Sequence, residues 1–227
     1  MPIAPAWHTA ALVALIVVVA ATGALLGHRA ASAPAASADP ASWARLLAIY
    51  LPLLAVQAFL LVYVCRIGRP RSALGALLGR RWTSWSRALS DLSIALSTWA
   101  FIQLCERGWS RAIGATSSAA VVAMLPRSLA ERIAWVLVSL CVGFTEEVVY
   151  RGYLQTQLTA FTRRAPLAVL IQAVLFGVAH GEQGPGAVVR LTVYGLAFGV
   201  IARARRSLLP GIVGHVWTNV ASGLLRL

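Results

Sequence analysis

Lysine is absent from this 227-residue chain, and acidic residues are scarce, so arginine carries all of the basic side-chain charge. The 20 basic residues outnumber the 7 acidic residues and give a net charge of +13. Charged residues make up only 12% of the chain, whereas 59% of the residues are hydrophobic. A soluble domain of this size cannot bury such a large apolar fraction, because its surface is too large relative to its volume. The composition therefore predicts a protein whose solvent is lipid.

Cysteine is scarce as well, and this excludes two kinds of site. The chain has 3 cysteines, Cys65, Cys105 and Cys141, and no two of them form a CxxC pair. A disulfide framework and a zinc knuckle are therefore not expected. No basic face with interleaved aromatic residues occurs, so nucleic acid is not expected as a partner either. The arginines lie between apolar runs instead, as is typical of positively charged loops that anchor membrane helices.

Long apolar runs predict an all-α, polytopic membrane helix bundle of about seven transmembrane helices, because about 20 residues are needed to cross the bilayer. The first run has no basic residue before it, which favours a retained helix; if it were a cleaved signal, six helices would remain. The predicted helices cover residues 8–27, 43–65, 86–105, 129–158, 166–181, 187–202 and 208–225.

Arginine-rich loops set the predicted orientation. The loops after the second, fourth and sixth helices lie on one side of the membrane, which the positive-inside rule makes cytoplasmic. Their arginines are Arg66, Arg69, Arg71, Arg80, Arg81 and Arg87 in the first, Arg163 and Arg164 in the second, and Arg203, Arg205 and Arg206 in the third. We divide the chain into an amino-terminal part, residues 1–128, which carries no motif, and a carboxyl-terminal core, residues 129–227.

Polar residues in the core interrupt runs that should lie in lipid, where ionisable groups are costly and mark function by default. Glu147 and Arg151 are four residues apart on a helix and can form an ion pair, whereas Glu146 points about 100° away and is left for chemistry. His215 and Asn219 share the same i,i+4 spacing.

Helix length predicts the depth of these groups. Glu146 and His180 lie 17 residues on either side of the turn at Arg163. Each would rise about 25 Å if both segments stay α-helical. His215 lies ten residues beyond Arg205, or roughly 15 Å, and this agreement is looser. A tilt, or an amphipathic segment in the membrane interface over residues 153–161, would close the difference.

Three motifs carry a family resemblance. Glu146 to Arg151 reads EExxxR, Phe176 to His180 reads FxxxH, and His215 to Asn219 reads HxxxN. In this order and spacing, residues 129–225 resemble the CPBP intramembrane proteases, which include type II CAAX prenyl endopeptidases and bacteriocin-processing or immunity proteins.

The resemblance implies an endopeptidase that cleaves a peptide or protein substrate near the cytoplasmic interface of a bacterial inner membrane. Glu146 and His180 would activate a water, and His215 and Asn219 would bind the carbonyl oxygen. Glu147, Arg151 and Phe176 would support them. Zinc is left open as a cofactor, because Glu146, His180 and His215 could ligate it, but a ligating Glu146 would not be free to act as the base. The substrate could itself be membrane-associated, and nothing in the sequence says that it is prenylated.

Two other functions fit the same polar cluster. The chain could be a non-catalytic membrane scaffold or immunity protein, in which the cluster only holds the fold. It could also be a small proton-linked transporter, because buried glutamate and histidine can relay protons. The absence of an HExxH sequence and of aspartates in a GxGD context argues against two other classes of intramembrane protease.

Overall fold

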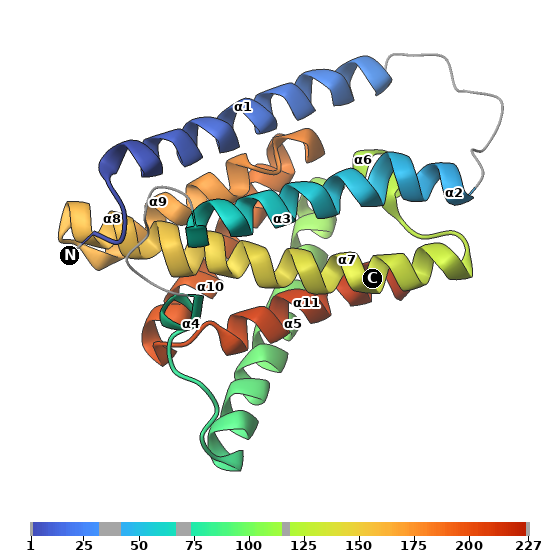
Figure 1. Cartoon of the computed structure of the whole chain (residues 1–227). Helices are drawn as coiled ribbons and strands as arrows, with labels where there is room; N and C mark the ends of the chain where they lie inside the picture. The colour runs from blue at the N-terminus through green and yellow to red at the C-terminus, as the bar shows by residue number, and fades with distance from the viewer. Residues whose placement is uncertain (1, 32–41, 67–73, 115–118, 226–227) are drawn as a thin grey trace.

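The computed structural model describes residues 2–31, 42–66, 74–114 and 119–225. Apart from an isolated bridge between Gly79 and Ser207, the regular structure in these ranges is helical (Figure 1). The predicted all-α bundle is thus confirmed. Arg69 and Arg71, which the sequence places in the first cytoplasmic loop, lie outside the described residues.

Each predicted helix has a counterpart in the structure. The amino-terminal part contains α1 (Ala6–Ala31), α2 (Ser42–Arg45), a π-helix η1 (Leu46–Tyr50), α3 (Leu51–Arg66), α4 (Leu74–Leu78), α5 (Trp85–Ile113) and α6 (Ala119–Met124). The core contains α7 (Leu129–Glu146), a π-helix η2 (Glu147–Leu154), α8 (Gln155–Thr162), α9 (Ala165–Val178), a short 3₁₀-helix η3 (Gly181–Gln183), α10 (Pro185–Arg205) and α11 (Leu209–Leu224).

Five helical stretches among the described residues are long and apolar enough to cross a membrane. They are Ala6–Leu25, Trp43–Arg66, Trp85–Ile113, Leu129–Thr162 and Pro185–Arg205. The other two predicted spans, α9 and α11, have only 14 and 16 residues. An α-helix of that length covers 21–24 Å, less than the roughly 30 Å of a bilayer core. The protein is an integral membrane protein, and about seven is an approximate count of its spans.

The chain turns that precede α5 and follow α10 meet at one end of the bundle. The Arg80 amide donates to the Arg206 carbonyl at 2.8 Å, and the Leu208 amide donates to the Leu78 carbonyl at 3.0 Å. The Ser207 hydroxyl adds a 2.7 Å bond to the Arg80 carbonyl. Two arginine-rich loops predicted to share a face therefore do so. We call this the arginine-rich end.

The amino terminus packs against α8 at its first turns. The Gln157 side chain donates to the Ala4 carbonyl at 2.9 Å and to the Thr9 hydroxyl at 2.8 Å. Tyr153, Leu154, Gln155 and Gln157 are buried. The sequence suggested that residues 153–161 lie in the membrane interface. The first half of this stretch is instead buried inside the protein. Gln157 faces the amino-terminal segment and Gln155 donates to the Gly199 carbonyl of α10, because these segments supply polar partners which lipid cannot supply.

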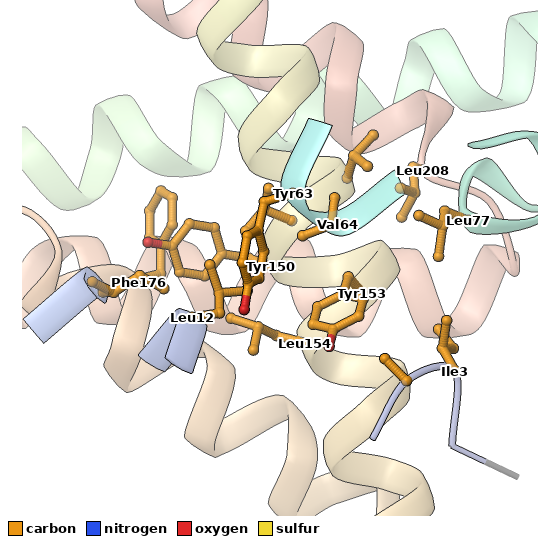
Figure 2. Packing of buried hydrophobic residues seen from close by; sticks show 14 of the residues in the cluster. Ile3, Leu12, Tyr63, Val64, Leu77, Tyr150, Tyr153, Leu154, Phe176 and Leu208 are labelled. Atoms are coloured by element: carbon orange, nitrogen blue, oxygen red, sulfur yellow. The ribbon is translucent and has the colours of Figure 1, made fainter. Parts of the chain in front are cut away.

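One hydrophobic cluster joins the amino-terminal helices to the core helices. Tyr150 and Tyr153 of η2 lie among Leu12 of α1, Tyr63 of α3 and Phe176 of α9 (Figure 2). All five side chains are buried. The amino-terminal helices thus cover the segment that carries the glutamates, and they shield it from lipid.

Gly195 sets the spacing between α9 and α10. A Cβ atom at this position would lie 2.9 Å from the Ala173 Cα and 3.1 Å from its carbonyl oxygen. The small-xxx-small face predicted at Gly195 and Gly199 therefore permits close helix packing, as expected.

Replacing Gly195 by leucine is expected to separate α9 from α10, because the obstructing atoms belong to the backbone. Overpacking of this kind destabilises a protein by about 1–3 kcal/mol. Thermal unfolding in detergent micelles measures the loss. Gly108 is the matched control, since a Cβ atom there meets nothing within 4 Å. Equal losses for Gly195→Leu and Gly108→Leu would contradict the packing role.

Candidate active site

The helix that carries the glutamates changes its winding where they occur. The α-helix α7 begins at Leu129 and is capped by Ser128, whose side chain accepts from the Glu131 amide. It passes into the π-helix η2 at Glu147. At the end of η2 the Gln155 amide donates to the Tyr150 carbonyl, five residues earlier. π-helical turns are rare and occur frequently at functional sites. The depth estimate from the sequence assumed α-helical rise throughout, and that assumption fails here.

Glu147 forms the expected ion pair with Arg151. Their side chains are 3.1 Å apart, and neither is exposed. The same Glu147 oxygen also lies 3.2 Å from Nδ1 of His215. The ion pair is confirmed, but Glu147 is not occupied by Arg151 alone. Its second role is to hold the His215 ring.

Glu146 lies on the other side of His215. Its Oε2 atom is 3.6 Å from His215 Nε2, and its Oε1 atom accepts from the Gln57 amide of α3 at 3.4 Å. His215 therefore bridges the two adjacent glutamates, one at each ring nitrogen. The Glu146 side chain is 11% exposed, and its Oε2 has no hydrogen-bond donor among the described residues. Buried polar atoms without a partner are uncommon and call for an explanation.

Two aromatic rings fix the orientation of His215. Phe198 of α10 stacks on it with ring centroids 5.4 Å apart and an angle of 17° between the planes. Phe176 of α9 contacts it edge-on at 5.9 Å. The helix α11 that carries His215 approaches α7 closely, because Gly143 leaves room for Val216. Helix packing thus decides where the imidazole lies.

Among the described residues, His180 is joined to this cluster through Phe176. It follows the last residues of α9, and its Nδ1 lies 2.8 Å from the Phe176 carbonyl oxygen. That bond makes Nδ1 the donor and leaves Nε2 as the acceptor. The ring centroids of Phe176 and His180 are 4.9 Å apart. The Arg151 guanidinium lies 4.4 Å from the centroid of the Phe176 ring. No hydrogen bond or ion pair connects His180 with Glu146 in the described part of the chain.

Asn219 lies one helical turn beyond His215 and is half-buried. Its main-chain carbonyl accepts from Trp135 Nε1 of α7 at 2.8 Å and from the Ser222 hydroxyl at 2.9 Å. These contacts hold the backbone of α11, and no hydrogen bond of the Asn219 amide group occurs among the described residues.

Two residues in contact with the cluster are not apparent from the motifs. Gln57 and Phe198 contact Glu146 and His215 from helices outside the three motifs. Gln57 had a signal in the sequence, because it is the only amide or charged side chain in the apolar run from Leu46 to Cys65. Phe198 had none, since aromatic residues are ordinary in a membrane helix.

Replacing Gln57 by leucine removes a hydrogen bond to Glu146 while keeping a side chain of similar size. We expect kcat for peptide cleavage to fall about 3- to 10-fold, because a charge-assisted hydrogen bond contributes roughly 1.5–3 kcal/mol and part of this acts on catalysis. Gln103→Leu on α5 is the matched control. An unchanged kcat in Gln57→Leu, with an unchanged fold, would show that this contact does not position the carboxylate.

The predicted zinc ligands fit only in part. The Nδ1 atoms of His180 and His215 face a carbonyl and a carboxylate, an arrangement that orients Nε2 toward a metal. However, the described residues contain no group of three or more His, Cys, Asp or Glu side chains placed to hold one ion together. Glu146 and His215 converge, and His180 does not join them.

Comparison with known proteins gives one family. Residues 127–221 match the model described as Rce1-like, type II CAAX prenyl endopeptidase Rce1-like. The matched segment is less than half of the chain and contains all three motifs. Comparison with curated proteins gave no match, and comparison with solved structures gave none either.

Proposed function

Because residues 127–221 match the Rce1-like model, which is consistent with a CPBP intramembrane protease, we propose that this protein hydrolyses a peptide bond with Glu146 as its general base. The family implies an intramembrane endopeptidase. The observation that carries the assignment of the base is the Glu146 side chain, which is 11% exposed and whose Oε2 has no hydrogen-bond donor among the described residues. Oε2 of Glu147 also lacks a donor, but Glu147 is fully buried and paired with Arg151.

Charge balance supports a reactive site at this point. Glu146 and Glu147 carry two negative charges, and Arg151 offsets one of them. A proton held by His215 would offset the other, because each ring nitrogen would then donate toward one glutamate. Buried charges are tolerated only when they are paired. Arg151 therefore serves Glu147, and His215 is the basic side chain beside Glu146.

In the proposed reaction, Glu146 takes a proton from a water molecule as the water oxygen attacks the carbonyl carbon of the substrate. The negative charge that develops on the carbonyl oxygen is stabilised by the Asn219 amide. Glu146 then returns the proton to the amide nitrogen, and the carbon–nitrogen bond breaks. One water is consumed, and a carboxylate and an amine are formed. His215 holds Glu146 in position throughout.

This sequence of steps modifies the roles that the family resemblance implies. His215 is assigned to Glu146 rather than to the carbonyl oxygen, because both of its nitrogens face glutamates. His180 stays on the side of the water, because its Nε2 is an acceptor that cannot donate to an oxyanion.

A second proposal is that the same residues bind a zinc ion. Glu146, His180 and His215 would be its ligands, and a zinc ion would polarise the carbonyl group. No step above depends on it. We expect metal analysis of the purified protein to settle the point, because a resident zinc should be present at about one ion per chain and be lost in Glu146→Gln/His215→Gln. Absence of bound zinc in an active preparation would remove this proposal.

The proposed substrate is a peptide segment of a membrane-associated protein at the arginine-rich end, in a bacterial inner membrane. The test is cleavage by purified protein in liposomes, followed by mass spectrometry. Substrates are membrane-anchored peptides offered as matched pairs, with and without a carboxyl-terminal farnesyl group. Cleavage of both forms would show that the protein does not require the farnesyl group for substrate recognition.

The same experiment separates the other two functions. A scaffold or immunity protein would cleave no peptide while binding its partner in Glu146→Gln as well as in the wild type. A transporter would show Glu146-dependent proton flux into the liposomes without hydrolysis.

A further inference from the structure

Outside the glutamate cluster, the structure has a polar pocket at the arginine-rich end. We call it the arginine pocket, and it has a volume of about 410 Å³. It is formed by the start of α5 and the end of α10. Among the residues that line it are Arg80, Ser84, Arg87, Ser90, Asp91 and Arg205.

The charges in the arginine pocket do not cancel. Asp91 pairs with Arg205 at 2.7 Å and also accepts from Trp82 Nε1 at 2.9 Å. For Arg80 and Arg87, the described residues provide no ion pair. Two of the three arginines are therefore uncompensated, and the pocket is suited to an anion.

An apolar groove adjoins this pocket, and Ser90 lines both. The groove lies between α5 and α10 and has a volume of about 880 Å³. We call it the α5–α10 groove. Its lining includes Ile94, Ser97, Phe101, Val193, Ala197 and Val200. From Ser90 to Phe101 it extends along α5 for about 16 Å, which is close to half of the roughly 30 Å bilayer core.

Tryptophans indicate where the arginine pocket lies in the bilayer. Trp82 precedes α5 and Trp85 is its first residue, which is 86% exposed. Tryptophan collects at the level of the lipid headgroups. The arginine pocket is thus at headgroup depth, and the α5–α10 groove reaches from it toward the middle of the membrane.

We propose that the arginine pocket and the α5–α10 groove together bind one anionic phospholipid, with its phosphate between Arg80 and Arg87 and an acyl chain in the groove. Charge complementarity favours a lipid over a protein helix, because an apolar helix offers nothing to the two arginines. Basic pockets between membrane helices are a known setting for anionic headgroups. The site is independent of the glutamates and of the proposed peptidase activity.

Native mass spectrometry of the full chain, released from micelles with equal amounts of phosphatidylglycerol and phosphatidylcholine, tests this site. The wild type should retain phosphatidylglycerol preferentially. Arg80→Gln/Arg87→Gln should weaken retention about 25-fold, because each arginine near anionic lipid contributes a factor of about five. The main-chain contacts of Arg80 are unaffected by this change. Arg163→Gln/Arg164→Gln in the α8–α9 turn is the control with the same loss of charge, and it should retain the lipid.

A second variant tests the acyl chain. Ser97→Phe fills the α5–α10 groove and should reduce retention of phosphatidylglycerol even though both arginines are present. Glycerol 3-phosphate, which has the headgroup chemistry without acyl chains, should not displace the lipid. Equal retention of the two lipids, loss in the control pair, unchanged retention in Ser97→Phe, displacement by glycerol 3-phosphate, or a dimer in place of the lipid would each overturn the proposal.

Discussion

Glu146→Gln is expected to lower the rate of peptide cleavage by at least 100-fold while leaving the fold intact. The amide keeps the size of the side chain and can still meet Gln57, but it cannot take a proton from water. General-base groups contribute about 10²- to 10⁴-fold to rate. The rate is measured under single-turnover conditions in liposomes, so that slow product release does not hide the chemical step.

The control for this variant is Glu106→Gln. Glu106 is also a glutamate in a membrane helix, and it accepts from Tyr194 at 2.6 Å and pairs with Arg190 at 3.3 Å. It lies outside the glutamate cluster, so we expect its removal to change the rate by less than about threefold, as for a partly exposed ion pair. Cleavage by Glu146→Gln at the wild-type rate would refute the proposed base.

Arg151→Met is expected to produce the largest loss of stability, about 3–5 kcal/mol in the free energy of unfolding. The substitution leaves Glu147 without its cation in a site from which solvent is excluded, and a buried charge without a partner is costly. Denaturant titration in mixed micelles measures the effect. The His215 contact offsets only part of it, because the ring cannot replace a guanidinium that also packs on Phe176.

A double variant separates charge from packing. Glu147→Leu/Arg151→Met removes both charges, and stability should recover by more than half, since apolar replacements of buried pairs are often neutral. Activity should not recover, because His215 has lost the group that orients it. Arg190→Met is the partly exposed counterpart and should cost about 1 kcal/mol or less. Similar losses for Arg151→Met and Arg190→Met would show that burial does not matter here.

Much of the fold can be predicted from the pattern of apolar runs, because the bilayer imposes both a minimum length and internal hydrogen bonding on each span. All seven predicted helices occur, and the turn predicted at Arg163 is where α8 ends. The ends of α9 were less predictable. His180 was expected inside that helix, but the α-helix ends at Val178 and a Gly-containing 3₁₀ turn follows.

The candidate site could be predicted only within single helices. The Glu147–Arg151 pair follows from i,i+4 spacing and is present. The contact of His215 with both glutamates depends on how α11 lies against α7, which no spacing within one helix specifies. Gln57 shows the same limit, because it reaches Glu146 from α3, 89 residues away in the chain.

By itself, the sequence determined that this protein is embedded in a lipid bilayer. It also determined which residues form its helices and which few polar residues must be accommodated among them. These features depend on composition and on local periodicity. Only the tertiary structure decided which polar groups meet, that the chain passes from α-helix to π-helix between Glu146 and Glu147, and that Phe176 separates His180 from the others. Those features depend on side-chain packing between distant helices, where glycines such as Gly143 and Gly195 set the closest approach.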